Sequence, residues 1–318
     1  IIWEKVVRNA QPHQSAHESG TWASASPVTD GERVYAFFGS NGLHCLSTSG
    51  KLLWEKDFGD MQVKHGHGEG SSPALYGDTI VVNWDHEGDS FITALDKSTG
   101  KERWRKARDE VTSWTTPIII ENDGRMQVVV CGSKAIRSYD LKTGKAIWRC
   151  GGLSKNVVAS PVYSKGILFA GSSYDTRIMM AIRITGAKGD LTGTDRILWR
   201  SQFRPPYVPS PLLVDDTLYY LRHYQNILTR RTAKTGEEPS GPFRLQGLYN
   251  IYASPVAAAG YIYITDQQGA TIVIDHKNPR PITLNRLEEG VNASAAIVGK
   301  DLLLRGTKHL YCIRENKE

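Results

Sequence analysis

Residues 71–104 read SSPALYGDTIVVNWDHEGDSFITALDKSTGKERW, and this stretch contains every element of a unit that recurs along the chain. It opens with a small-Ser-Pro-apolar element, continues through short β-branched and aromatic runs, and ends with a glycine-containing turn before a tryptophan. Short runs of this composition, bounded by Gly and Asp, are typical of hairpin strands and not of helices. The stretch therefore predicts one four-stranded antiparallel sheet.

The opening element recurs at intervals of about 40 to 50 residues, which is the period expected of propeller blades. Its copies are Ala25-Ser26-Pro27-Val28, Ser71-Ser72-Pro73-Ala74, Thr115-Thr116-Pro117-Ile118, Ala159-Ser160-Pro161-Val162, Pro209-Ser210-Pro211-Leu212, Ala253-Ser254-Pro255-Val256 and the degraded Ala293-Ser294-Ala295-Ala296. Repeats then begin near residues 22, 68, 112, 156, 206, 250 and 291. The sequence predicts an all-β, seven-bladed β-propeller of four-stranded antiparallel blades, forming a single domain over residues 1–318.

A second signature, D-x-x-T-G-K, appears at residues 96–101 and 140–145 and precedes the outermost strand. Its Asp can accept backbone N–H bonds while its Gly adopts the left-handed conformation that closes the hairpin. A tryptophan follows at a fixed place, and we expect its ring to be buried against the neighbouring blade. These tryptophans are Trp54, Trp104, Trp148 and Trp199, with Phe243 and Ile282 expected in their place in the fifth and sixth repeats.

The four cysteines have neither the CxxC spacing of a zinc site nor the density of a disulfide framework. Cys45 and Cys312 occupy matching repeat positions, where other repeats carry Ala94 or Ser138. We therefore expect them to be small buried residues.

The last repeat ends without an outer strand, and residues 1–5, IIWEK, match residues 52–56, LLWEK. Residues 1–7 are therefore expected to complete the last blade, a closure that pairs otherwise exposed strand edges.

Bulk composition excludes several classes of protein. A hydrophobic content of 40% with 23% charged residues is that of a soluble globular protein, and no apolar run has the length of a membrane helix. The net charge of +6 is dispersed, so we expect no nucleic-acid partner. No leader peptide is recognisable in this chain, and we expect a monomer.

Taken together, the repeated motifs resemble the quinoprotein-like (pyrroloquinoline-quinone-type) propeller family across nearly the whole chain. The dehydrogenases of that family are larger, generally eight-bladed, and use a quinone with calcium, an Asp base and often adjacent cysteines. This chain has no adjacent cysteines, and no local motif aligns an Asp with that base. It is more similar to the scaffold branch, which includes the lipoprotein subunit of the outer-membrane barrel-assembly machinery, and this resemblance implies an extracytoplasmic (periplasmic or secreted) location.

The residues that could hold a metal gather in the second repeat. The segment His65-Gly66-His67-Gly68-Glu69-Gly70 is expected to face the loop 84–89, which contains His86. Imidazole and carboxylate are the usual non-thiolate ligands of zinc, so His65, His67, Glu69 and His86 form a candidate site, to which His13, His17 and Glu18 could add. The alternative is that histidines in a glycine-rich loop simply meet water.

In a propeller, the loops before the first strand and those between the second and third strands share one face, called here the rim. Aromatic, amide and guanidinium groups there suit a protein or peptide partner, and a glycan is a further option. The alternative is that half of them pack loops. The candidate partner-binding residues are Trp22, Trp114, Asn156, Tyr174, Arg177, Arg204, Tyr207, His223, Tyr249, Asn250 and Asn292.

Neither a nucleophile elbow nor a phosphate-binding loop occurs in the sequence. We therefore expect a non-catalytic binding or assembly scaffold with no cofactor. The alternative is a quinone- or metal-dependent oxidoreductase with its centre at the channel mouth.

Overall fold

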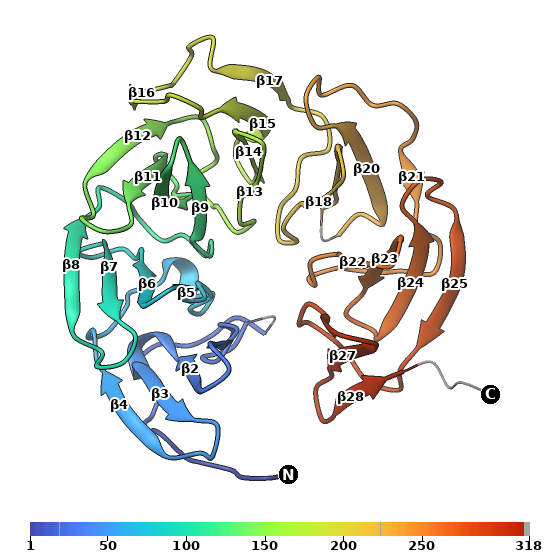
Figure 1. Cartoon of the computed structure of the whole chain (residues 1–318). Coiled ribbons are helices and arrows are strands. Elements are labelled where there is room, and N and C mark those ends of the chain that lie inside the picture. The colour runs from blue at the N-terminus through green and yellow to red at the C-terminus, as the bar shows by residue number, and fades with distance from the viewer. Residues whose placement is uncertain (19, 223, 315–318) are drawn as a thin grey trace. The chain divides into compact units, whose positions relative to one another are not determined.

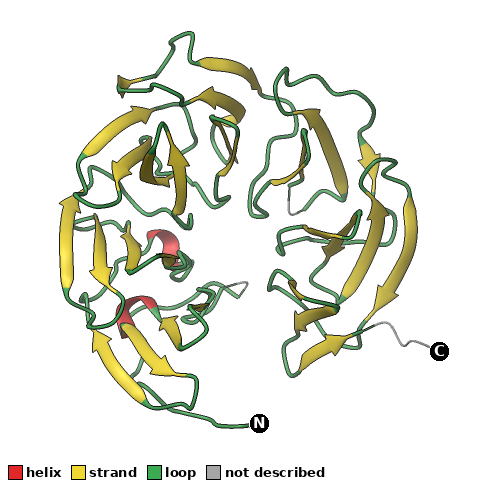
Figure 2. Cartoon of the chain, viewed as in Figure 1, coloured by secondary structure: helices red, strands yellow, loops and turns green. Residues whose placement is uncertain are grey.

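The structure, a computed structural model, describes residues 1–18, 20–222 and 224–314, and it confirms a seven-bladed β-propeller (Figures 1 and 2). Apart from strands, these residues form two short 3-10 turns, η1 (Gly39–Asn41) and η2 (Lys64–Gly66). No helix in this part of the chain has the length and apolar character needed to span a membrane. Two compact units can be distinguished, residues 1–161 with 184–194 and residues 162–183 with 195–314, and each is described by itself.

The first unit contains the sheets of the first three blades, in which consecutive strands pair in antiparallel fashion. The first sheet is β1 (Val28–Thr29), β2 (Arg33–Phe37), β3 (Leu43–Ser47) and β4 (Leu52–Lys56); the second is β5 (Ala74–Tyr76), β6 (Thr79–Trp84), β7 (Phe91–Asp96) and β8 (Glu102–Ala107); the third is β9 (Ile118–Asn122), β10 (Arg125–Val130), β11 (Ile136–Asp140) and β12 (Ala146–Cys150).

The third sheet departs from the prediction because it has a fifth strand. The two-residue strand β16 (Gly189–Asp190) pairs in parallel with the outer strand β12. It comes from residues 184–194, an insertion between the third and outer strands of the fourth repeat that is too long for a hairpin turn. Asp190 fixes the insertion by accepting hydrogen bonds from the Arg149 guanidinium at 2.7 and 2.9 Å.

The second unit contains the sheets of the other four blades. They are β13 (Val162–Ser164), β14 (Ile167–Ser173), β15 (Arg177–Arg183) and β17 (Ile197–Ser201); β18 (Leu212–Val214), β19 (Thr217–Tyr220), β20 (Ile227–Thr232) and β21 (Phe243–Arg244); β22 (Val256–Ala258), β23 (Tyr261–Thr265), β24 (Ala270–Asp275) and β25 (Pro281–Arg286); and β26 (Ala296–Val298), β27 (Asp301–Arg305) and β28 (Leu310–Ile313). The last sheet thus has three strands among the described residues.

A β-bulge recurs between the third and outer strands and explains the repeat's small residue. In the first sheet, the register shifts between Cys45 and Leu46, immediately after Cys45 pairs with Trp54. Ala94, Ser138 and Ala181 pair with their tryptophans in the same way, each just before a bulge. A small side chain opposite the indole leaves room for the ring, and Cys45 is fully buried as predicted.

Two predictions at this position are wrong. Ile282 does not take the place of the tryptophan, because the register pairs Val273 with Thr283 before the bulge, and Ile282 is 56% exposed. Val273 fills the space that a small residue leaves elsewhere, so a smaller partner fits opposite it. Cys312 is exposed, because the last sheet has no described outer strand to cover it.

Three outer-strand tryptophans contact the hairpin turn of the next blade, as predicted, whereas Trp148 donates to the Gln127 side chain of its own blade at 3.3 Å. The indole N–H of Trp54 donates to the Lys97 carbonyl at 3.0 Å, and its ring lies over Gly100. Trp104 contacts the Leu141 carbonyl and Gly144 in the same way, and Trp199 contacts the Ala233 carbonyl and Gly236. The three glycines have positive φ, and a Cβ there would lie 2.5 to 2.6 Å from the ring. Only glycine both adopts this positive φ readily and leaves room for the indole ring.

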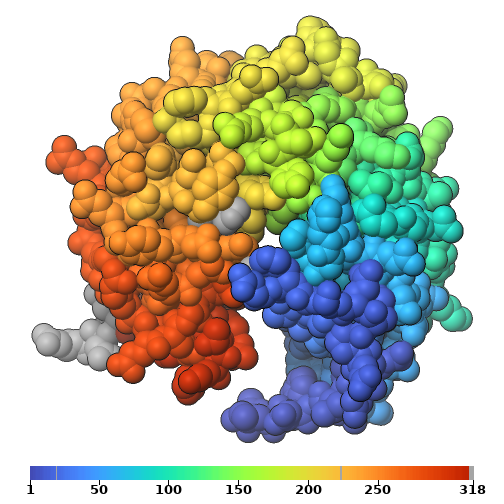
Figure 3. Space-filling view, turned by 180° about the vertical axis from the view of Figure 1, so that it is seen from behind, coloured from blue at the N-terminus to red at the C-terminus, as the bar shows by residue number. Residues whose placement is uncertain are grey.

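Trp3 makes this same contact with the first blade. Its indole N–H donates to the Thr48 carbonyl at 2.7 Å, and its ring lies over Gly50, which has φ +84°. Figure 3 shows the N-terminal segment in dark blue at the surface of the first unit. Residues 1–7 form no strand in the structure, so their pairing with the last sheet stays a prediction. Trp3 nevertheless contacts the first blade in the way that an outer-strand tryptophan contacts the next blade along the chain.

The tryptophan contact predicts graded losses of stability. Trp104→Ala should lower the free energy of unfolding by about 3–5 kcal/mol, because the buried ring is replaced by a cavity. Trp3→Ala should cost less, because Trp3 is 37% exposed. Denaturant unfolding followed by circular dichroism measures both. Trp3→Phe is the control that keeps an aromatic ring but removes the N–H donor, and a Trp3→Ala variant as stable as the native chain would contradict the role of this residue.

Candidate functional site

The hairpin loop of the second blade contacts Gln62, which precedes the predicted segment 65–70. The backbone N–H of Gln62 donates to Nδ1 of His86 at 3.1 Å, and the N–H of Glu87 donates to the Gln62 carbonyl at 2.8 Å. His86 itself is buried, with 7% of its surface exposed. The contact therefore uses His86 as a hydrogen-bond acceptor for the backbone.

The four residues predicted to bind a metal do not form a ligand set. Glu69 turns toward the first blade, where it accepts hydrogen bonds from the Ser40 backbone N–H at 2.7 Å and from the Ser40 hydroxyl. The His65 and His67 rings lie 5.8 Å apart, while His86 contacts Gln62 instead. In residues 1–18, 20–222 and 224–314, no three His, Cys, Asp or Glu side chains are placed to hold a metal ion. The donors on Ser40 account for the position of Glu69.

His65 and His67 instead form an aromatic group with His17 and Trp114. His67 lies 5.1 Å from His17 and 6.0 Å from Trp114 between ring centroids. Burial, followed by the nearby His17 and His65, lowers the pKa of His67. These rings therefore pack the loops of the first unit around a neutral imidazole at pH 7.

A small cavity lies between these loops and tests the quinone hypothesis at this place. Trp22, Glu69, Asn83, Asp85 and Trp114 are among its lining residues, and its volume is about 10 Å³. That is room for about one water molecule, whereas pockets for cofactor-sized molecules measure roughly 300–1,000 Å³. The residues of the second-repeat rim therefore do not fit a quinone here.

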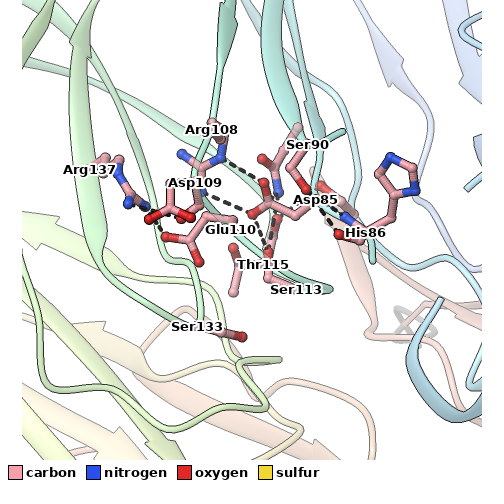
Figure 4. A network of polar contacts seen from close by, with 12 residues as sticks. Asp85, His86, Ser90, Arg108, Asp109, Glu110, Ser113, Thr115, Ser133 and Arg137 are labelled. Carbon is pink, nitrogen blue, oxygen red and sulfur yellow. Dashed lines mark hydrogen bonds and ion pairs between the residues drawn. The ribbon is translucent and has the colours of Figure 1, made fainter. Parts of the chain in front are cut away.

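A buried ion pair lies next to this cavity and joins the second and third blades (Figure 4). Arg108 donates to the two carboxylate oxygens of Asp85 at 2.6 and 2.9 Å, and both side chains are 0% exposed. Ser113 and Asn83 also donate to Asp85, at 2.7 and 3.2 Å, and Arg108 donates to the Tyr139 hydroxyl at 2.9 Å. The pair is thus almost completely hydrogen-bonded.

The protonation of Arg108 follows from these contacts. Burial by itself would lower its pKa, but the Asp85 carboxylate and the Tyr139 hydroxyl more than offset this, so the pKa lies above its ordinary value. Arg108 is therefore a permanent cation, and its function is to hold the hairpin loop of the second blade against the strands of the third.

Carboxylates also fix the hairpin loops of two other blades. Glu110 accepts from the backbone N–H groups of Lys134 and Ala135 at 2.8 and 3.1 Å and pairs with Arg137. In the last blade, Glu289 accepts from the backbone N–H groups of Lys308 and His309. These loops therefore carry their own acceptors and keep a fixed shape.

The predicted partner-binding residues differ in how far they reach solvent. Tyr174 and Tyr249 are 52% and 57% exposed, and Arg177 is also exposed. Tyr207 is half-buried and stacks on Tyr174, with centroids 6.3 Å apart. All four belong to the second unit, so this unit retains the most accessible part of the predicted surface.

The remaining candidates take part in internal contacts. Half-buried Trp114 donates to the Gly68 carbonyl at 2.8 Å, and half-buried Trp22 lies 5.3 Å from the His13 ring. Arg204 pairs with Glu238, Asn156 is buried, and Gln267 bridges Asn250 and Asn292. His223 lies outside the described residues. Trp22, Trp114, Arg204 and Asn156 thus contribute to packing, whereas Asn250 and Asn292 are exposed, and a role of any of these residues in binding stays a prediction.

The repeats, their sheets and the loops at the rim define a quinoprotein-like β-propeller. The sequence profile of the family described as outer membrane protein assembly factor BamB matches residues 1–239, and the chain belongs to that family. An outer membrane protein assembly factor BamB from Francisella salina is 28% identical over 98 residues, which are 31% of this chain and 17% of that protein. The match therefore spans about a sixth of that relative.

Solved structures resemble the chain in fold. BamB from Moraxella catarrhalis superposes with a TM-score of 0.67 at 16% identity, covering 90% of this chain and 83% of that one. A europium-containing methanol dehydrogenase superposes at 0.63 with 10% identity, covering 88% and 72%. Sqt1 from Saccharomyces cerevisiae superposes at 0.67 with 10% identity, covering 91% and 83%. At such identities these similarities concern the fold alone.

The buried pair predicts an asymmetric double-mutant cycle. Asp85→Asn should lower the free energy of unfolding by about 3–5 kcal/mol, because it leaves the Arg108 charge buried without its counter-ion. The double variant Asp85→Asn/Arg108→Met should recover much of this loss, because it removes the stranded charge. Denaturant unfolding measures both, and a double variant that is less stable than Asp85→Asn would overturn this explanation.

Glu69 predicts a dependence of stability on pH. Burial raises its pKa above the ordinary 4.5, and the two Ser40 hydrogen bonds offset only part of this. The folded state then binds the proton more tightly than the unfolded chain, so this contribution to stability is lost as pH rises from about 4.5 through the folded value. Glu69→Gln should therefore gain stability relative to the native chain between pH 4 and pH 8. Unfolding at both pH values tests this, and an unchanged difference would exclude it.

Proposed function

We propose that the chain is a non-catalytic docking scaffold that works outside the cytoplasm, in the periplasm, and binds a protein partner through its rim. Membership of the family described as outer membrane protein assembly factor BamB supports this assignment. The proposed partner is accordingly a protein that takes part in outer membrane protein assembly.

The observation that carries the proposal is the exposure of tyrosines on loops that strands hold in place. Tyr174 follows β14 directly, and Tyr249 has its backbone N–H bound by the Asp266 carboxylate at 2.8 Å. Rigid aromatic side chains that protrude into solvent give large contact area at low entropic cost, which is why they are enriched in protein interfaces. No observation favours the quinone- or metal-dependent alternative.

Site-specific photocrosslinking tests the docking surface. p-Benzoylphenylalanine in place of Tyr174 or Tyr249 should give a discrete crosslinked protein in the native envelope, because these rings lie where the partner binds. Tyr76 is the matched control, since it is a 48% exposed tyrosine at the end of β5 beside a hairpin turn. Crosslinks that are absent at both rim positions, or that are equally strong at Tyr76, would refute docking through the rim.

A further inference from the structure

Arg108 and Arg222 are the two buried arginines of the described chain, and Arg222 differs from Arg108 in lacking an acidic partner. It follows β19 by two residues and is 8% exposed, and its Nε–H has no hydrogen-bond partner. Arg108 and Arg137 each pair with a carboxylate, and Arg204 and Arg231 share that of Glu238. A buried cation without an acceptor is costly, so its retention calls for an explanation.

A second guanidinium lies beside it. Arg177 opens β15 in the neighbouring blade of the same unit, and after burial its positive charge contributes to lowering the pKa of Arg222. Within the described residues, neither Arg177 nor Arg222 forms a salt bridge, and no side-chain partner is found for Arg222 Nε. Ser173, paired with Arg177 across the hairpin, is 1% exposed and its hydroxyl also lacks a hydrogen-bond partner. The guanidinium groups of Arg177 and Arg222 and the hydroxyl of Ser173 are therefore available to donate hydrogen bonds to an acceptor of a partner.

Aromatic rings lie near Arg222 but cannot satisfy its N–H donors. The Arg222 guanidinium carbon lies 4.4 Å from the centroid of the Tyr224 ring, a cation–π distance. The Tyr207 hydroxyl raises the pKa of Arg222 and so offsets part of its lowering, and the Tyr207 ring stacks on Tyr174. The rings stabilise the charge, but their faces are poor acceptors for guanidinium N–H groups, which carboxylates bind in bidentate fashion.

We propose that Arg177 and Arg222 bind a carboxylate side chain of an acidic segment in the partner protein, with Tyr174 and Tyr224 packing against the segment on either side. The proposal rests on the docking function proposed above and names the chemistry of its partner. A peptide fits better than a free small anion, because Tyr174 and Tyr224 are 52% and 49% exposed and offer apolar area that a small anion would leave uncovered.

Binding of a fluorescent hexaglutamate peptide at low ionic strength, followed by fluorescence anisotropy, tests the site. Arg222→Gln and Arg177→Gln should each weaken binding about tenfold, because each removes a charge-assisted hydrogen-bond donor. Arg200→Gln is the control, since Arg200 is exposed on the outer strand β17 of the same unit, and it should leave binding nearly unchanged. Circular dichroism should show folded variants, because removing a stranded charge does not destabilise the chain.

Several outcomes would overturn the proposal. If Arg222→Gln and Arg177→Gln both leave hexaglutamate binding intact, or if Arg200→Gln weakens it equally, the peptide is attracted by net charge alone. Binding of inorganic phosphate, measured by calorimetry, without any binding of hexaglutamate would assign the arginines to a free anion. Crosslinking at Tyr174 that persists in Arg177→Gln/Arg222→Gln would refute this anchor while leaving the docking function intact, whereas arginine-dependent hexaglutamate binding without crosslinks would do the reverse.

Discussion

The contact between an outer-strand tryptophan and the next hairpin turn is the constraint on which the rest of the structure depends. A four-stranded sheet has two faces, and it becomes stable only when neighbouring sheets cover them. The indole of Trp104 provides this cover and also requires a glycine at 144, a free carbonyl at 141 and a small residue, Ala94, opposite it. Three positions in two blades are thereby tied to one side chain.

Because the strands are fixed in this way, the rim loops have little freedom and their polar groups must be satisfied where they lie. Glu69, Glu110 and the Asp85–Arg108 pair do this in the first unit, so its polar groups are largely occupied by internal hydrogen bonds. In the second unit, Arg222 has no corresponding carboxylate. This difference in internal compensation, more than the number of exposed residues, distinguishes a loop that supports the fold from one that can bind a partner.

Much of the fold follows from the sequence because its signals repeat. The turn signature at 96–101, the tryptophans and the small residue opposite them recur in register, so each copy supports the others. Ile282, which does not take the tryptophan's place, and the added strand β16 lie where the repeat degenerates. There the packing of the side chains decides the register of the outer strand and the position of the insertion, and the repeat pattern does not. Glu69 was misjudged for the same reason, since its partner Ser40 lies 29 residues away in another blade.

The buried Asp85–Arg108 pair has no counterpart in the repeat, and therefore no periodic signal could reveal it. Its one trace is a carboxylate directly after the fully buried strand β6 and an arginine directly after β8, charges placed where a chain usually returns to solvent. The same reasoning explains how a methanol dehydrogenase and an assembly factor can share this fold at such low identity. The tryptophan contact constrains the turns and strands, whereas the sequence of the rim loops is free to vary. Function must therefore be argued from buried charges without an internal partner, such as Arg222.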